Sequence, residues 1–319
     1  MGRGSPVGRS PEVALVVVQG GVGSTIQDRG RVGFRGFGVP VGGAFDPESL
    51  DLANALLGND ESAAAVELTL VGGAYRAECP LALALAGAAM AATVGDGSAS
   101  GRAVPVPGSF AIRAGEILKL GGCPSGARAY LAVGGGFRTP VVLGSRSSES
   151  RLRVGERLPA SPGWTRSRRP VADLDRSSGP IRVVDGPDAD PAWGGAAMLE
   201  GVAYRVSTRA DRMGLRLEGP AIGRIADPGR ASAPVAPGAV QVAGGRPIVL
   251  GVAGGTMGGY PHPAHVISAD LARLGRLRPG EAVAFRRVEV EEARRLDQER
   301  RRKLARWLAA IRAGGLDRG

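Results

Sequence analysis

The charged residues of this chain that could do chemistry stand between glycines. The stretch "STIQDRGRVGFRGFGVPVGGAFDPESLDLAN" places Asp28, Arg29, Arg31 and Asp46 among glycines that include Gly43. Glycine lets backbone N–H groups approach an anion closely, and arginine offers a planar fork that binds a carboxylate or a phosphate at two points. The stretch is therefore either a loop built around an anion or a salt-bridged turn, and the residue types alone favour the turn.

Two later clusters repeat this pattern of charges and glycines. In "STRADRMGLRLEG", strand alternation puts Leu215 and Leu217 on one face and Arg212 with Arg216 on the other. In "GGTMGGYPHPAHVISADL", two glycines precede Tyr260. Each cluster also has a purely structural interpretation. The first could be a half-exposed barrel strand, and the second could be a tight hairpin with a buried tyrosine.

Familiar catalytic and cofactor templates are missing from the sequence. No G-x-x-x-x-G-K-[ST] phosphate loop occurs, and "GGVGSTI" lacks the third glycine of a dinucleotide fingerprint. His262 and His265 are separated by Pro263, which argues against a helical metal pair, and nothing marks a nucleophile elbow. Cys79 and Cys123 do not have a metal-ligand spacing. We therefore expect no metal and no covalent nucleophile.

Composition excludes two classes of partner. The formal net charge is +11, but nearly all cations are arginine and the aromatic fraction of 4% is too small for base-stacking platforms, so no nucleic acid is expected. The apolar runs "VALVVV" and "PLALALAGAAMAAT" are too short for a signal peptide or a bilayer span. Two cysteines imply no disulfide framework. A soluble cytoplasmic protein without a membrane partner is expected.

Local patterns predict a mainly β protein with a few helices. With 52 glycines and 23 prolines, short strands joined by tight turns are favoured, in the rhythm of antiparallel barrels or sandwiches. A helix is predicted over 47–57, with Asp46 as N-cap, Pro47 in its first turn and Gly58 ending it. The predicted organisation is a disordered lead (1–12), a first barrel lobe (13–145), a crossing segment (146–180), a second barrel lobe (181–288) and a charged C-terminal helix (289–319).

Taken together and in order, these stretches resemble the biotin-dependent carboxyltransferase-like family. That family includes the C-type component of 5-oxoprolinase, the KipA sporulation regulator and the carboxyltransferase part of urea carboxylase. The resemblance extends from about Val13 to Arg287, and its seven motifs are collinear. They are "STIQDRGRVGFRGFGVPVGGAFD" with "LANALLGN", "AVELTLVGG", "GARAYLAVGGGF", "VLGSRSS", "STRADRMGLRLEG", "PGAVQV" with "GGRPIVL", and "GGYPHPAHVISADL" with "RPGEAVAF".

The resemblance implies two cyclophilin-like β-barrel lobes with the site between them. It also implies a partner, a KipI-like (5-oxoprolinase B-type) subunit, to which the oxoprolinase adds an A-type subunit. That complex resembles an ATP-dependent amidase that opens the small lactam 5-oxoproline to glutamate, and the resemblance leaves open whether ATP is bound by this chain or mainly by the partner subunit. The urea carboxylase relatives instead move a carboxyl group from carboxybiotin to urea.

The same resemblance implies roles for the glycine-flanked residues. Both chemistries pass through an anionic intermediate, which arginine forks and glycine amides can stabilise and orient. The candidate catalytic residues are Asp28, Arg29, Arg31 and Asp46. The candidate substrate-binding residues are Gly43, Arg212, Gly258, Gly259 and Tyr260.

The chain departs from the family pattern at three positions. Where the family commonly has a glutamate this chain has Ala233, and where it has an aspartate and a glutamine this chain has Ala253 and Gly255. A carboxylate removed from a site cannot act as a base or pair with an arginine. The fold assignment survives these changes, whereas they leave the specific reaction open.

Three functional hypotheses follow. The first is the C-type subunit of a 5-oxoprolinase-like, ATP-dependent amidohydrolase. The second is a biotin-dependent carboxyltransferase acting on a urea-like amide, for which a separate carrier would have to supply biotin because no "AMKM" context occurs here. The third is a catalytically silent, KipA-like regulatory subunit.

Overall fold

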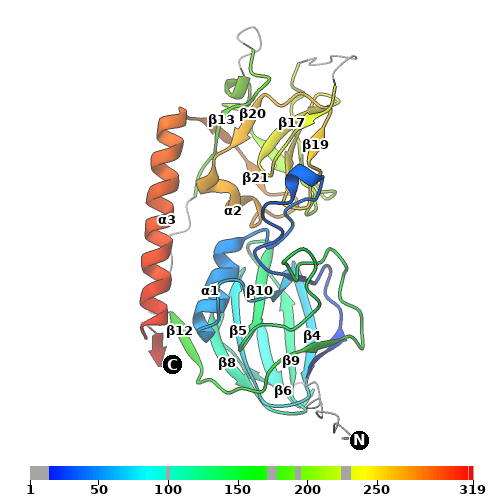
Figure 1. Cartoon of the computed structure of the whole chain (residues 1–319), viewed down its shortest axis with the longest axis vertical. Coiled ribbons are helices and arrows are strands. Elements are labelled where there is room, and N and C mark those ends of the chain that lie inside the picture. Colours follow the sequence, from blue (N-terminus) through cyan, green and yellow to red (C-terminus); the bar gives the residue numbers. More distant parts are fainter. Residues whose placement is uncertain are drawn as a thin grey trace, which may run out of the picture.

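A computed structural model of the chain describes residues 14–97, 101–170, 178–190, 195–223 and 231–314, and the backbone of 316–318. Two lobes rich in β-structure lie end to end along the long axis, and a long C-terminal helix runs beside both of them (Figure 1). The disordered lead expected over residues 1–12 lies outside the described residues. In the described ranges, no helix is long and apolar enough to cross a membrane.

The first lobe packs two antiparallel sheets around one apolar core, in a barrel-like arrangement. One sheet has the order β11 (Arg157–Pro159), β1 (Ala14–Gln19), β4 (Val71–Ala77), β9 (Ile117–Gly122), β6 (Ala92–Gly95) and β7 (Arg102–Ala103). The other has the order β2 (Thr25–Gln27), β3 (Ala65–Thr69), β10 (Arg128–Val133), β5 (Leu81–Gly87), β8 (Gly108–Ile112), β12 (Arg168–Pro170) and β23 (Leu316–Arg318).

The second lobe curls a single main sheet around its own apolar core. The order of that sheet is β21 (Ala282–Val283), β14 (Tyr204–Val206), β15 (Gly214–Glu218), β18 (Arg246–Leu250), β17 (Ala239–Ala243), β20 (Ala264–Val266), β13 (Ile181–Asp185) and β22 (Phe285–Arg287). A small ribbon joins β16 (Ala233–Pro234) to β19 (Met257–Gly258). The prediction of a mainly β protein with two barrel lobes is confirmed.

Helix α1 (Pro47–Leu57) forms as its end signals predict. The Asp46 carboxylate accepts hydrogen bonds from the backbone N–H and the hydroxyl of Ser49, Pro47 opens the first turn, and Gly58 ends the helix with a left-handed φ of 68°. The helix packs its leucines and alanines on β5 and β10. Besides α2 (Leu271–Leu274), three short 3-10 turns are described, namely η1 (Arg35–Phe37), η2 (Gly195–Leu199) and η3 (Ser268–Asp270).

Helix α3 (Val290–Arg312) touches both lobes. Its C-terminal half packs Leu308 and Ile311 against the α1 side of the first lobe, while Leu296 packs against the second lobe. The Arg300 side chain forms an ion pair with Glu48 of α1. The predicted charged helix is therefore not merely solvated, since it bridges the two barrels (Figure 1).

The stretch 146–180 differs from the expected crossing segment. Its strands β11 and β12 pair with β1 and β8, and they therefore extend the sheets of the first lobe. The β12 strand also pairs with β23, which returns after α3. An Arg- and Pro-rich composition suits short strands at or near the edge of a sheet as well as it suits a linker, and composition alone does not separate the two.

Candidate functional site

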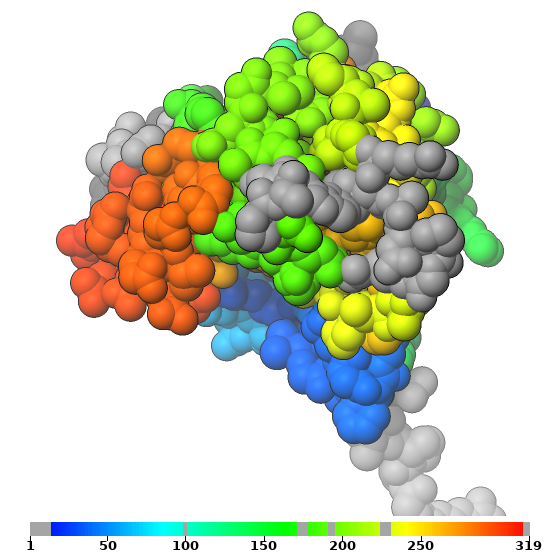
Figure 2. Space-filling model, turned by 90° about the horizontal axis from the view of Figure 1, so that it is seen from above, coloured from blue at the N-terminus to red at the C-terminus, as the bar shows by residue number. Residues whose placement is uncertain are grey.

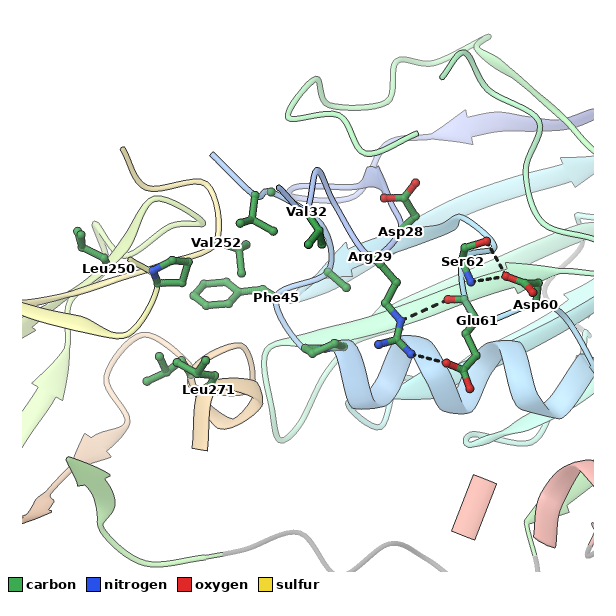
Figure 3. A pocket seen from close by; sticks show the side chains of 16 residues that line it. Asp28, Arg29, Val32, Phe45, Asp60, Glu61, Ser62, Leu250, Val252 and Leu271 are labelled. Atoms are coloured by element: carbon green, nitrogen blue, oxygen red, sulfur yellow. Dashed lines mark hydrogen bonds and ion pairs between the residues drawn. The ribbon is translucent and has the colours of Figure 1, made fainter. Parts of the chain in front are cut away.

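A cleft of about 660 Å³ lies between the lobes. One end is apolar, where Phe45 and Val32 of the first lobe face Leu250, Val252 and Leu271 of the second (Figure 3). The other end is polar and belongs to the first lobe; its residues are Asp28, Arg29, Asp60, Glu61 and Ser62. A concave, mostly apolar site with a few convergent polar groups is the usual form of a small-molecule site.

Glycines let two segments of the opening stretch cross at the rim of this cleft. A Cβ on Gly30 would lie 2.4 Å from the Val41 carbonyl oxygen, and one on Gly43 would lie 2.8 Å from the backbone at Arg29 and Gly30; both glycines have φ near +80°. The Arg31 N–H donates to the Val41 carbonyl at 2.7 Å. Gly43 thus positions the loop, and its carbonyl oxygen accepts from the Arg212 side chain.

Asp28 anchors that loop to the segment after residue 144. Its carboxylate accepts hydrogen bonds from the hydroxyls of Ser145 and Ser147 and from the backbone N–H groups of Gly30 and Arg146, at 2.6–2.8 Å. Burial alone would raise the pKa of Asp28, but these four donors outweigh it and lower the pKa. A carboxylate so fully engaged is suited to holding the loop rather than to accepting a substrate proton.

We expect Asp28→Asn to lower the free energy of unfolding by about 1–3 kcal/mol, because the amide nitrogen faces donors where an acceptor is needed. Urea unfolding at pH 7 measures this loss. Asp211→Asn is a control on an exposed loop, where among the described residues the carboxylate accepts from the backbone N–H groups of Met213 and Gly214. Equal effects of the two substitutions would contradict the anchoring role.

Arg29 is the one cation among the described residues that line the cleft. Its Nη2 atom lies 2.8 Å from Oδ1 of Asp51 and 3.1 Å from Oε2 of Glu61. The side chain is 42% exposed, so it remains accessible from the cleft. Of the four candidate catalytic residues, Arg29 is the one whose position suits contact with a ligand.

Arg31 and Asp46 make contacts away from the cleft lining. An Arg31 Nη2 hydrogen donates to the Ser147 carbonyl at 2.6 Å. Asp46 is fully buried, caps α1 and accepts two hydrogen bonds from Arg276 of the second lobe, at 2.8 and 2.9 Å. In this structure both residues hold elements together.

Arg212 lies between the lobes and has a partner for each group of its fork. It donates to Glu67 at 2.6 Å, to Glu149 at 2.8 and 2.9 Å, and to the Gly43 carbonyl at 2.7 Å. The expected alternation after it is confirmed, since Leu215 and Leu217 are buried and Arg216 is exposed. Arg212 itself precedes β15, and its side chain forms a contact from the second lobe to Glu67 and Gly43 of the first lobe.

The sequence interpretation missed the buried acid that Arg212 meets. Glu67 is fully buried on β3, where Tyr130 donates a hydrogen bond at 2.6 Å and Arg128 lies 3.4 Å away. Burial alone would raise the pKa of Glu67, but Arg212 and Arg128 outweigh it and lower the pKa. The available signal was a glutamate between Val66 and Leu68 in an otherwise apolar strand.

The glycines and the tyrosine of the third predicted cluster lie outside the cleft lining. Gly258 pairs with Ala233 in the β16–β19 ribbon, and a Cβ on Gly258 would lie 2.4 Å from the Gln241 side-chain nitrogen. Tyr260 is 53% exposed, so the alternative reading of a buried tyrosine is wrong. Nearby, the loop 31–39 of the first lobe lies against the second lobe (Figure 2), where Arg35 donates to the Val235 carbonyl.

One of the three positions that depart from the family pattern, Ala253, is close to the lobe contact. The Ala253 N–H donates to the Arg212 carbonyl at 3.1 Å, directly after the cleft residue Val252. An aspartate at position 253 would bring a further acid to a region that already holds Glu67 and Glu149. Among the described residues, no group of three or more His, Cys, Asp or Glu side chains is arranged to hold a metal ion.

Two barrel lobes with a cleft between them define the architecture of this chain. A solved structure of K. lactis urea amidolyase superimposes with a TM-score of 0.82 at 24% identity, and it covers 94% of this chain and 20% of that one. At this identity the likeness shows the fold, and the chain spans about a fifth of that protein's length.

A family model described as the carboxyltransferase domain, subdomain A and B, matches residues 37–287, and the chain belongs to that family. The C-type subunit of the 5-oxoprolinase of Escherichia coli (strain K12) is 33% identical over 308 residues, covering 90% of this chain and 96% of that protein. The urea amidolyase of Saccharomyces cerevisiae is 27% identical over 319 residues, covering 89% of this chain and 17% of that protein.

Proposed function

We propose that this chain is the C-type subunit of a 5-oxoprolinase-like, ATP-dependent amidohydrolase. The observation that carries the proposal is the near full-length match to the C-type subunit of the E. coli 5-oxoprolinase, at 33% identity. The name of that relative denotes one subunit of an enzyme, and we therefore propose that B-type and A-type subunits complete the complex. The cleft between the lobes supplies a site of suitable size and shape.

The cleft can both enclose the lactam ring and stabilise the negative charge of the substrate. Its apolar end, formed by Phe45, Leu250 and Val252, can enclose a lactam ring and exclude water from it. Arg29 at the other end can hold a carboxylate, or the negative charge that develops on a carbonyl oxygen as the ring opens. The chain would thus bind and orient the substrate without forming a covalent bond to it.

The charges that line the cleft do not favour ATP. Among the described lining residues, the acidic side chains of Asp28, Asp60 and Glu61 stand against the single guanidinium of Arg29, which already has acidic neighbours. A triphosphate carries several negative charges and needs several donors or cations. We therefore propose that a partner subunit binds ATP.

Reconstitution tests this function. The chain is co-expressed with its B-type and A-type partners, and the purified complex is assayed for ATP-dependent conversion of 5-oxoproline to glutamate. We expect turnover by the wild-type complex and a loss of about 10²–10³-fold in kcat/KM for Arg29→Ala. The matched control is Arg286→Ala, which removes a similarly exposed arginine of the second lobe that pairs with Glu292 of α3, and it should retain activity within about two-fold.

Other outcomes assign other functions. A stable complex that consumes neither ATP nor 5-oxoproline would overturn the proposal and favour a silent, KipA-like subunit. Transfer of a carboxyl group from carboxybiotin to urea would favour the carboxyltransferase reading, which the similarity to urea amidolyase keeps as the second candidate. An insoluble Arg29→Ala chain would show that this arginine is structural.

A further inference from the structure

The arginine of the cleft is shared between two carboxylates that differ sharply in burial. Glu61, on the rim, is 64% exposed, whereas the Asp51 side chain on α1 is only 5% exposed. The Arg29 Nε–H and one Nη2 hydrogen are directed at Glu61, as Figure 3 shows. Asp51 Oδ1 lies within ion-pair distance of Nη2, but it receives no aligned hydrogen bond.

Asp51 depends on Arg29 for its negative charge. Of the charged groups with the largest effects on its pKa, Arg29 is the one cation, and the others are the carboxylates of Glu61, Asp46 and Glu48. Asp46 and Glu48 are themselves paired with Arg276, and Glu48 also with Arg300 of α3. Burial raises the pKa of Asp51 to about 7, although Arg29 opposes the shift. Taking Arg29 away would leave the buried Asp51 carboxylate without the cation that it faces, which is a costly arrangement.

An anionic ligand in the cleft would compete for this same guanidinium. A carboxylate that enters from the open side meets Arg29 first, because Asp51 lies behind it and is buried. Bidentate pairing with a carboxylate uses the planar fork best, and neither of the present partners occupies the fork in that way.

We propose that Arg29 passes from Asp51 to the carboxylate of the bound ligand, and that Asp51 takes up one proton from solvent as it does so. The site then binds a monoanionic carboxylate together with a proton, and no net charge is added to an already acidic end of the cleft. This inference rests on the proposed function, because 5-oxoproline is a lactam that carries such a carboxylate. Asp51 is a positioning residue here, since it acts on the ligand through Arg29.

The proposal fixes the sign of the pH dependence. Below about pH 7, Asp51 is already protonated, so binding takes up no proton and the affinity is independent of pH. Above that value each bound ligand takes up a proton, and Kd rises about tenfold per pH unit. A neutral lactam without a carboxylate, such as 2-pyrrolidinone, does not draw Arg29 away and binds without proton uptake.

Calorimetric titration of the assembled complex with 5-oxoproline, without ATP, tests the exchange. At pH 8, in buffers of different ionisation enthalpy, the wild type should take up about one proton per ligand. Asp51→Asn should take up none and should lose the pH dependence of Kd between pH 6.5 and 8.5. Glu61→Gln is the matched control, because it removes the exposed partner of Arg29 and should keep the proton uptake.

Three results would overturn the inference. They are binding to the wild type at pH 8 without proton uptake, undiminished uptake by Asp51→Asn, and no binding of 5-oxoproline at any pH from 6.5 to 8.5. The reconstituted activity separates this inference from the proposed function. Turnover of 5-oxoproline with a KM that does not change with pH would refute the exchange alone, whereas a complex without turnover would refute the function.

Discussion

Replacing Glu67 by glutamine is expected to lower the free energy of unfolding by about 3–5 kcal/mol at pH 7. Glu67 is fully buried and is the acid that Arg212 and Arg128 share between the lobes. Glutamine keeps the shape and one acceptor oxygen but removes the negative charge. Two largely buried guanidiniums then lose their common counter-ion, which costs far more than a surface pair does.

The pH dependence separates this charge effect from a packing effect. Because Arg212 and Arg128 lower the pKa of Glu67, its contribution to stability is present above the pKa of an unfolded glutamate, about 4.3, and is lost as the pH falls through the lower folded value. Wild type and Glu67→Gln should therefore converge in stability in acid, where both side chains are neutral.

Urea unfolding of both proteins between pH 2.5 and 7 follows the start of this convergence, because the difference should shrink by about 1.4 kcal/mol per pH unit below about pH 4.3. Glu78→Gln is the control, since Glu78 pairs with the exposed Arg157 and should cost no more than about 1 kcal/mol. A loss below 1 kcal/mol for Glu67→Gln at pH 7, or an equal loss at every pH, would show that the buried pairs do not stabilise the lobe contact.

Sequence patterns predicted the features that depend on neighbouring residues. The cap at Asp46, the first turn at Pro47 and the end at Gly58 are determined within a few residues, and helix α1 follows them. The alternation of Leu215, Arg216 and Leu217 likewise needs only strand geometry. Such local signals were enough to predict the fold class and much of the order of the helices and strands.

The partners of the candidate site residues could not be predicted in this way. Arg212 meets Glu67 across 145 residues, and Arg276 meets Asp46 across 230. Nothing in the local sequence of an arginine states which distant carboxylate will lie beside it after folding. From the sequence, the glycine-rich stretch could be either an anion-binding loop or a salt-bridged turn. The structure has features of both, since the backbone crosses closely at Gly30 and Gly43 and Arg29 forms an ion pair.

The exposure of Tyr260 could not be predicted from its neighbours in the sequence either. A tyrosine next to glycines and prolines was read either as a ligand contact or as a buried core residue. Its surroundings depend on how β19 pairs with β16, which is a long-range contact made by two-residue strands. The side chain lies mostly in solvent, outside the lining of the cleft.

We expect Arg276→Met to cost about 3–5 kcal/mol and to loosen the contact between the lobes. Arg276 belongs to the second lobe and binds the fully buried Asp46 at the start of α1 with two hydrogen bonds, and it also contacts Glu48. Methionine keeps much of the length and the apolar stem but leaves Asp46 without its cross-lobe counter-ion.

The loss should reach the cleft because the same turn packs directly on its wall. A Cβ on Gly275 would lie 2.4 Å from the carbonyl oxygen of Phe45, whose side chain lines the cleft. The Arg128 side chain donates to the Gly275 carbonyl at 2.7 Å, and its guanidinium lies 4.5 Å from the centre of the Phe45 ring. Movement of this turn therefore shifts a residue of the ligand site.

Hydrogen exchange at the amides of Phe45 and Asp46, measured together with urea unfolding, tests this coupling. The two amides donate to Glu67 and Tyr130 respectively, and Arg276→Met leaves both of these partners in place. Faster exchange in Arg276→Met would therefore report loosening of the segment at the lobe contact rather than the loss of a hydrogen-bond partner. Arg300→Met is the matched control, because it removes the ion pair of α3 with Glu48 but leaves Arg276 in place. If Arg300→Met costs as much as Arg276→Met, helix α3 rather than the 275–276 turn sets the distance between the lobes, and the width of the cleft depends on the C-terminal helix.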